Sequence, residues 1–186
     1  MGEPHVARTP PDLSARLEPL AAADERAVEA QLGRRPRGVA GVAWRCPCGR
    51  PGVVATDPRL PGGIPFPTTY YLTCPRAVAA CSTLEAGGVM AEMSDRLAAD
   101  PELAASYRAA HEAYLADRGA LGDVPEIAGT SAGGMPTRVK CLHALVGHAL
   151  AAGPGVNPLG DEAVALIGEF WRRPCLEDAA DQEHRP

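Results

Sequence analysis

The chain has 186 residues, of which 46% are hydrophobic, so it is long enough to bury one substantial core and we expect a single domain. Its 18 basic and 23 acidic residues give a net charge of −5 and are scattered along the chain, which argues against nucleic acid or an anionic membrane as a partner. Residues 1–16 contain no apolar run typical of a secretory signal, and no later stretch is long and apolar enough to cross a membrane, so we predict a cytoplasmic protein.

The first half of the chain predicts a helix followed by a small sheet. A helical pattern over residues 12–33 is broken at Pro19, and Gly33 is suited to end it. Alternating apolar residues begin at Val39, and a run of β-branched and aromatic residues precedes Cys74. We expect about three antiparallel strands, over residues 39–48, 53–56 and 68–73, with a turn-rich connection over residues 57–67.

The chain after Cys74 has helical periodicity. Helices are predicted from Pro75 to the Gly87-Gly88 pair, then around Met90–Leu97, from an Asp100 cap onward, over residues 137–152, and from Asn157-Pro158 onward. The predicted fold class is therefore α+β, with the sheet packed by a helical C-terminal half. We expect residues 1–23 to form a flexible or helical extension, residues 24–173 to form one globular domain, and residues 174–186 to form a disordered tail.

Three cysteines fall at turn-like positions near the ends of the predicted sheet. A zinc ion binds four deprotonated ligands, and cytoplasmic cysteines rarely form stable disulfides, so Cys46, Cys48 and Cys74 are candidate zinc ligands. Two cysteines with one residue between them in an extended strand would hold their sulfurs roughly 7 Å apart. Cys46 and Cys48 can therefore share one ion only if the chain bends at Pro47. Cys74 lies at a helix N-terminus, where the helix dipole favours its thiolate.

Three residues farther along the chain compete to complete the site. Cys141 is the natural fourth ligand, with His143 and His148 as rivals. On a helix Cys141 and His148 share a face but are separated by roughly 10 Å of rise, too far for both to bind one ion. One of them would instead support a ligand without contacting the ion. An iron–sulfur cluster, a reactive thiol, or simply buried thiols are the alternatives to zinc.

A glycine-rich segment is a second candidate site. It runs into the predicted helix over residues 137–152, and free N–H groups at a helix start together with cations can bind phosphate or carboxylate. The residues that would form this anion cradle are Ser131, Gly133, Gly134, Arg138 and Lys140. The segment lacks the Gly-Lys-Ser/Thr of a nucleotide-binding loop, and a capping loop explains it as well.

A set of short motifs extends over roughly residues 30–166: Trp44–Gly49, Arg59–Pro61, Pro65–Thr68, Tyr71–Thr73 with Pro75, Ala132–Pro136, Arg138–His143 and Gly153–Asp161. Together they resemble an uncharacterised actinobacterial family, the domain of unknown function numbered five-hundred-and-one. In the family pattern the position of Cys74 is Cys or His and that of Cys48 can be Asn. The resemblance thus implies Cys46, Cys74 and Cys141 as ligands, and the family's gene neighbours imply a link to cell division or phosphate metabolism.

The sequence therefore predicts a zinc protein, with two alternative roles for the ion. If the ion keeps an open position, metal-bound water would attack an anionic, phosphate-bearing substrate held by the glycine-rich loop, as in a metal-assisted hydrolase. If the ion is fully ligated, the protein is a non-enzymatic interaction module with a protein partner, and a thiol-redox protein is the remaining alternative.

Overall fold

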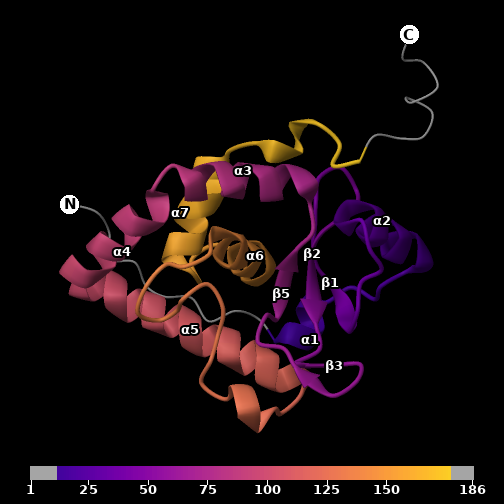
Figure 1. The fold of residues 1–186 in the computed structure, drawn as a ribbon, viewed down its shortest axis with the longest axis horizontal. Helices are drawn as coiled ribbons and strands as arrows, with labels where there is room; N and C mark the ends of the chain where they lie inside the picture. Colours follow the sequence, from indigo (N-terminus) through magenta and orange to yellow (C-terminus); the bar gives the residue numbers. More distant parts are fainter. Residues whose placement is uncertain (1–11, 177–186) are drawn as a thin grey trace.

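The computed structural model describes residues 12–176, which form an α+β fold and confirm the predicted class (Figure 1). Residues 1–11 and 177–186, and the predictions that fall on them, lie outside the described residues. The strands are β1 (Val39–Arg45), β2 (Pro51–Thr56), β3 (Arg59–Leu60), β4 (Ile64–Pro65) and β5 (Tyr70–Leu72). The helices are α1 (Leu13–Arg16), α2 (Ala22–Leu32), α3 (Pro75–Ala86), α4 (Val89–Ala99), α5 (Pro101–Leu121), α6 (Leu142–Ala152) and α7 (Pro158–Ile167), with short 3-10 turns at Pro125–Ile127 and Phe170–Arg172.

The three-stranded sheet is antiparallel, as predicted, and its strand order is β1-β2-β5. Its central strand β2 is buried along its whole length, and Val54 pairs with Val42 on one side and Tyr71 on the other. Because successive side chains of a strand point to opposite faces, Val53 and Leu72 lie on the opposite face, in the main core. The connection between β2 and β5 contains the two-residue strands β3 and β4, a hairpin that the sequence did not predict.

Helix α6 occupies the centre of the molecule and packs on the sheet (Figure 1). It is apolar nearly all round, with eight of its residues buried, as expected for a helix covered on several sides. A side chain at Gly147 would meet the Tyr70 carbonyl oxygen at 3.2 Å, and one at Gly160 of α7 would meet the Leu145 carbonyl oxygen at 2.6 Å. Glycine at these two positions therefore lets β5 and α7 approach α6 closely.

The long helix α5 begins where the sequence predicts, because the Asp100 side chain accepts hydrogen bonds from the N–H groups of Glu102 and Leu103. The predicted start of α6 at residue 137 is wrong, since the helix begins at Leu142. The backbone before it is instead held by contacts with other elements, for example the hydrogen bond from Val139 N–H to Ser94 Oγ. No helix within residues 12–176 has the length and apolar character needed to cross a bilayer.

Candidate metal centre

A tight turn between β1 and β2 presents the first two thiols. Strand β1 ends at Arg45, and the next four residues turn back with a hydrogen bond from Gly49 N–H to the Cys46 carbonyl oxygen at 2.8 Å. Gly49 has φ +85°, a conformation that glycine adopts readily. The turn supplies the bend that the sequence requires at Pro47, and the sulfur atoms of Cys46 and Cys48 lie within 4.8 Å of each other.

Cys74 reaches the same place from the junction of β5 and α3. It precedes Pro75 at the start of α3, is fully buried, and its sulfur accepts the N–H groups of Arg76 and Ala77. A hydrogen bond from the Cys175 thiol and these backbone donors outweigh burial and lower the pKa of the Cys74 thiol. This direction agrees with the prediction made from its place at a helix N-terminus.

Cys175 joins these thiols from the C-terminal segment. Its sulfur lies 3.0 Å from that of Cys48 and forms a hydrogen bond with Cys74. It also accepts a hydrogen bond from Gln31 Nε2 at 3.5 Å. The flanking backbone is also held, because Arg76 donates to the Pro174 carbonyl oxygen at 3.3 Å and Arg50 donates to that of Leu176. The described chain therefore departs from the expected disordered tail in residues 174–176, whose cysteine is buried.

The four thiols form one group that we call the thiol cluster: Cys46, Cys48, Cys74 and Cys175. The sulfurs of all but Cys74 lie within 4.8 Å of one another, and Cys74 is hydrogen-bonded to Cys175. Four ligands about 2.3 Å from a tetrahedral zinc ion have sulfurs about 3.8 Å apart, so modest shifts would fit an ion among Cys46, Cys48 and Cys175. Cys74, beside Cys175, would have to move toward that ion to become the fourth ligand. Cys175 is not among the ligands predicted from the sequence, although one signal distinguishes it: each cluster cysteine adjoins a proline, at Pro47, Pro75 or Pro174, whereas Cys81 and Cys141 do not.

Without a cation, the thiols of Cys46 and Cys175 resist ionisation. Burial and the neighbouring Cys48 raise the pKa of the Cys46 thiol to about 12, and the Cys74 hydrogen bond with burial raises the pKa of Cys175. Four adjacent thiolates would repel one another strongly in a buried place. A divalent ion removes that repulsion and stabilises the deprotonated forms, and thiolate ligands favour zinc or an iron–sulfur cluster.

The structure separates the other predicted ligands from the thiol cluster. Cys141 and His143 lie in a second group with Glu85, in which the ligand atoms are again within 4.8 Å of one another. His148 belongs to neither group of possible metal ligands found within residues 12–176. Of the six predicted ligands, the structure thus brings together Cys46, Cys48 and Cys74.

His148 is a core residue in this fold. It is completely buried on α6, stacks on the Tyr70 ring at 5.7 Å, meets the Tyr114 ring edge-on at 5.1 Å, and its Nδ1 lies 3.2 Å from Asn157 Nδ2. Burial, with a smaller contribution from the charge of Arg16, lowers the pKa of His148 to about 3. These surroundings favour a neutral imidazole that packs with aromatic rings.

The glycine-rich loop is closed by its own hydrogen bonds. Lys140 N–H donates to the Gly133 carbonyl oxygen at 2.7 Å, and Arg138 N–H donates to that of Gly134 at 3.2 Å. Ser131 is buried, and its hydroxyl lies 2.8 Å from His111 Nδ1. The loop stands before an extended segment and not at a helix start, so the arrangement on which the anion cradle depended is not formed.

A Glu85 oxygen instead accepts Leu142 N–H at 2.7 Å at the first turn of α6. The anionic group at this helix N-terminus is therefore a carboxylate of the protein itself.

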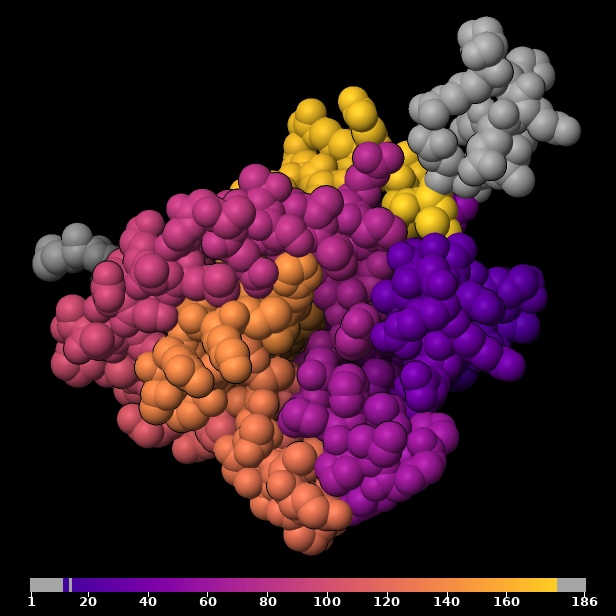
Figure 2. Space-filling view, in the orientation of Figure 1, coloured from indigo at the N-terminus to yellow at the C-terminus, as the bar shows by residue number. Residues whose placement is uncertain are grey.

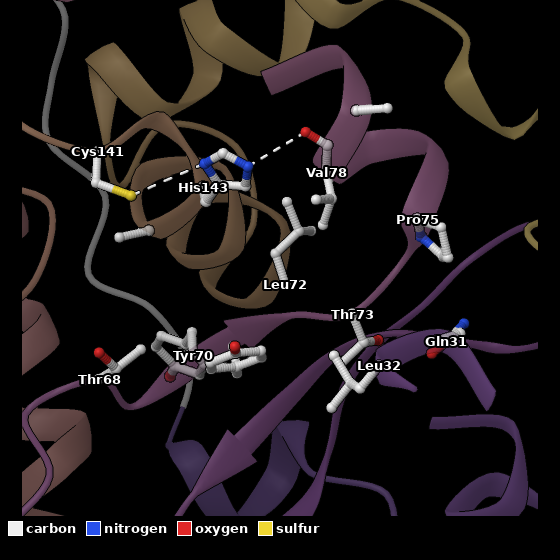
Figure 3. A pocket seen from close by; sticks show the side chains of 13 residues that line it. Gln31, Leu32, Thr68, Tyr70, Leu72, Thr73, Pro75, Val78, Cys141 and His143 are labelled. Carbon is white, nitrogen blue, oxygen red and sulfur yellow. Dashed lines mark hydrogen bonds between the residues drawn. The ribbon is translucent and has the colours of Figure 1, made fainter. Parts of the chain in front are cut away.

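A cavity of about 540 Å³ lies between the thiol cluster and the second group. Figure 3 shows Cys141 and His143 at one end and Gln31 at the other, with Leu72 between them and Tyr70 along the lower side. In the space-filling view the surface is hollowed where the magenta, orange and indigo segments meet (Figure 2). The walls are mostly apolar, so the cavity suits a ligand with an apolar body.

The fold and the site define an α+β protein with a buried cysteine cluster that could hold a metal ion. A family model described as "Protein of unknown function (DUF501)" matches residues 42–165, and the chain belongs to that family. The matched segment contains the first three cluster cysteines and ends before Cys175. No curated protein and no solved structure matches the chain.

Proposed function

We propose that the protein is a zinc-stabilised ligand-binding protein, in which the thiol cluster holds one structural zinc ion. The observation that carries this proposal is the meeting of Cys175 with Cys48, 3.0 Å apart, beside Cys46 and Cys74. Structural zinc sites use four protein ligands, and sites made only of cysteine are among the commonest. Four thiolates leave no coordination position for water, so this ion would not itself catalyse hydrolysis.

The zinc ion would act by fixing one wall of the cavity. Thr73 and Pro75, which flank Cys74, line the cavity, and so does Gln31, which donates to Cys175. Joining Cys48 to Cys175 also closes a loop of 127 residues and thereby restricts the unfolded chain. The ion would therefore stabilise the fold and hold the cavity in a shape that can bind a ligand.

Metal analysis tests this proposal directly. Protein purified without an affinity metal is expected to contain at least one equivalent of zinc, and the Cys175→Ser variant should contain one equivalent less. Cys81→Ala is the matched control, because Cys81 is also buried but belongs to neither group of possible ligands within the described chain. Less than about a tenth of an equivalent of zinc in the wild type would contradict the proposal, and a brown protein would indicate an iron–sulfur cluster in its place.

A thiol-redox function is the second candidate, because two thiols 3.0 Å apart are close enough to be oxidised to a disulfide after a small movement. Alkylation under reducing conditions separates the two functions. Zinc-bound cluster thiols should label slowly and become reactive after chelation. Fast labelling of untreated protein, with loss of two thiols per chain after mild oxidation, would favour the redox function.

We further infer that the protein works in a reducing compartment such as the cytoplasm, since its six cysteines are all free thiols. An interaction-module role linked to cell division or phosphate metabolism remains compatible with a structural ion. Co-purification of a defined division or phosphate-metabolism protein with the wild type, and not with Cys175→Ser, would support that role.

A further inference from the structure

We propose that Glu85, Cys141 and His143 form a second divalent-metal site, separate from the thiol cluster and open toward the cavity. His143 Nδ1 lies 3.0 Å from Glu85 Oε1 and 3.9 Å from Cys141 Sγ, and the three ligand atoms lie within 4.8 Å of one another. Carboxylate, imidazole and thiolate are all zinc ligands. This inference deepens the proposed ligand-binding function and rests on the same cavity.

The orientation of the His143 ring supports a metal at Nδ1. The other ring nitrogen, Nε2, lies 3.2 Å from the Val78 carbonyl oxygen (Figure 3) and 3.3 Å from the Ser82 hydroxyl. The Ser82 hydroxyl donates its own hydrogen to the same carbonyl at 3.0 Å, so both oxygens near Nε2 act as acceptors and Nε2 carries the hydrogen. The lone pair of Nδ1 then faces the Glu85 carboxylate and the Cys141 sulfur, which are electron-rich as well. A cation between these three atoms would replace their mutual repulsion with metal–ligand bonds. Metal-binding histidines commonly donate their second N–H to a backbone carbonyl in this way.

The separations of the ligand atoms are close to those of a tetrahedral site. With bonds of about 2.3 Å to sulfur and about 2.0 Å to nitrogen and oxygen, the nitrogen–sulfur separation is about 3.5 Å and the nitrogen–oxygen separation about 3.3 Å. The observed values of 3.9 and 3.0 Å differ from these by a few tenths of an ångström. The Glu85 carboxylate is held in place because it also accepts Leu142 N–H.

Three protein ligands leave a fourth position, and the cavity indicates what fills it. Cys141 and His143 line the cavity, and the side chains of His143 and Glu85 are about a quarter exposed, at 26% and 23%. The remaining walls include Leu32, Leu72 and Val78. The site would therefore take a small ligand whose anionic or carbonyl head binds the ion while its apolar body fills the cavity.

Cobalt loading of the full chain tests the second site, since cobalt(II) is a spectroscopically visible substitute for zinc. The wild type is expected to hold two equivalents, and Cys141→Ser and Glu85→Gln are each expected to hold one. Both variants should fold: Cys141 is the N-cap of α6, where serine is favoured, and a glutamine oxygen can still accept Leu142 N–H. Cys81→Ala should hold two equivalents.

Two results would overturn the second site: a wild type that holds one equivalent which Cys175→Ser loses and Cys141→Ser keeps, or a Cys141→Ser variant that holds as much cobalt as the wild type. In the first case His143 and Glu85 form an ordinary ion pair. Failure of the thiol cluster gives a different pattern, in which Cys175→Ser holds as much cobalt as the wild type. The two proposals can therefore fail independently.

Octanohydroxamate tests the open position, because its head binds metal ions and its chain is apolar. It should change the visible spectrum of the cobalt-loaded wild type and leave that of cobalt-loaded Cys141→Ser unchanged. Acetohydroxamate, which has the same head, should bind at least about tenfold more weakly, since it lacks the methylene groups that the cavity would bury. A spectrum unaffected by octanohydroxamate, or equal affinity for both probes, would overturn an open position facing the cavity.

Discussion

The two groups of possible metal ligands differ in composition, burial and origin. The thiol cluster contains only sulfur, its members Cys46, Cys74 and Cys175 are no more than 6% exposed, and its thiols come from a hairpin turn, a helix start and the C-terminal segment. The group of Glu85, Cys141 and His143 combines oxygen, sulfur and nitrogen on α3 and at the start of α6, beside a cavity. A closed sulfur site suits a structural ion, whereas a mixed site with a free position suits ligand binding.

Removing a cluster thiol should have the largest effect. Cys175→Ser is expected to lower the free energy of unfolding by at least about 3 kcal/mol, because the affinity of a structural zinc ion contributes directly to folding. Urea unfolding of zinc-loaded protein measures the change. A loss equal to that of Cys81→Ala would mean that no ion links the C-terminal segment to the sheet.

Weakening a neighbour of the thiol cluster should have a smaller effect. Gln31→Leu removes the N–H donor to Cys175 and should lower zinc affinity at the cluster tenfold to hundredfold, or about 1.4–2.7 kcal/mol. Competition with a chromogenic chelator measures the affinity. Occupancy of the second site, followed in the same titration, should not change, and equal weakening at both sites would contradict their independence.

His148 offers a contrast to a metal-binding histidine. Its pKa of about 3 in the fold lies below the ordinary value of about 6.5, so between these values the unfolded chain binds a proton that the native state does not. This contribution to stability is complete above about pH 6.5 and is lost as the pH falls. From pH 7 to pH 5 the wild type should lose about 2 kcal/mol more than His148→Gln in urea unfolding. Parallel pH profiles would show that His148 is not buried in a neutral form.

Changing the second site should affect stability least. Cys141→Ser is expected to alter the free energy of unfolding of metal-free protein by no more than about 1 kcal/mol, because serine is a good N-cap residue. Urea unfolding in the presence of a chelator measures it. A loss as large as that of zinc-loaded Cys175→Ser would assign Cys141 a structural role and remove the contrast between the two groups.

Local patterns in the sequence were sufficient to predict much of the fold. Alternating residues predicted the strands of the main sheet, and the Asp100 cap fixed the start of α5. The start of α6 could not be predicted in this way, because Glu85 meets Leu142 N–H from a residue 57 positions away. The β3–β4 hairpin was missed because two-residue strands among prolines leave no periodic signal.

In the candidate site, too, only the features that depend on neighbouring residues could be predicted from the sequence. The bend between Cys46 and Cys48 is local, and the sequence indicated that Pro47 had to supply it. The arrival of Cys175 depends on donors from Gln31, Arg50 and Arg76, which lie about a hundred or more residues earlier in the chain. An acidic segment that follows Pro174 resembles a tail until those contacts are known.

Gln31 is a single side chain that belongs to two places at once, since it donates to Cys175 and also lines the cavity. Any molecule that moves this amide on entering would alter how firmly the thiols are held. Thermodynamic reciprocity then requires the metal to change the affinity of the incoming molecule by the same factor. One amide group would thus be enough to make the occupancy of the cavity sensitive to the supply of metal.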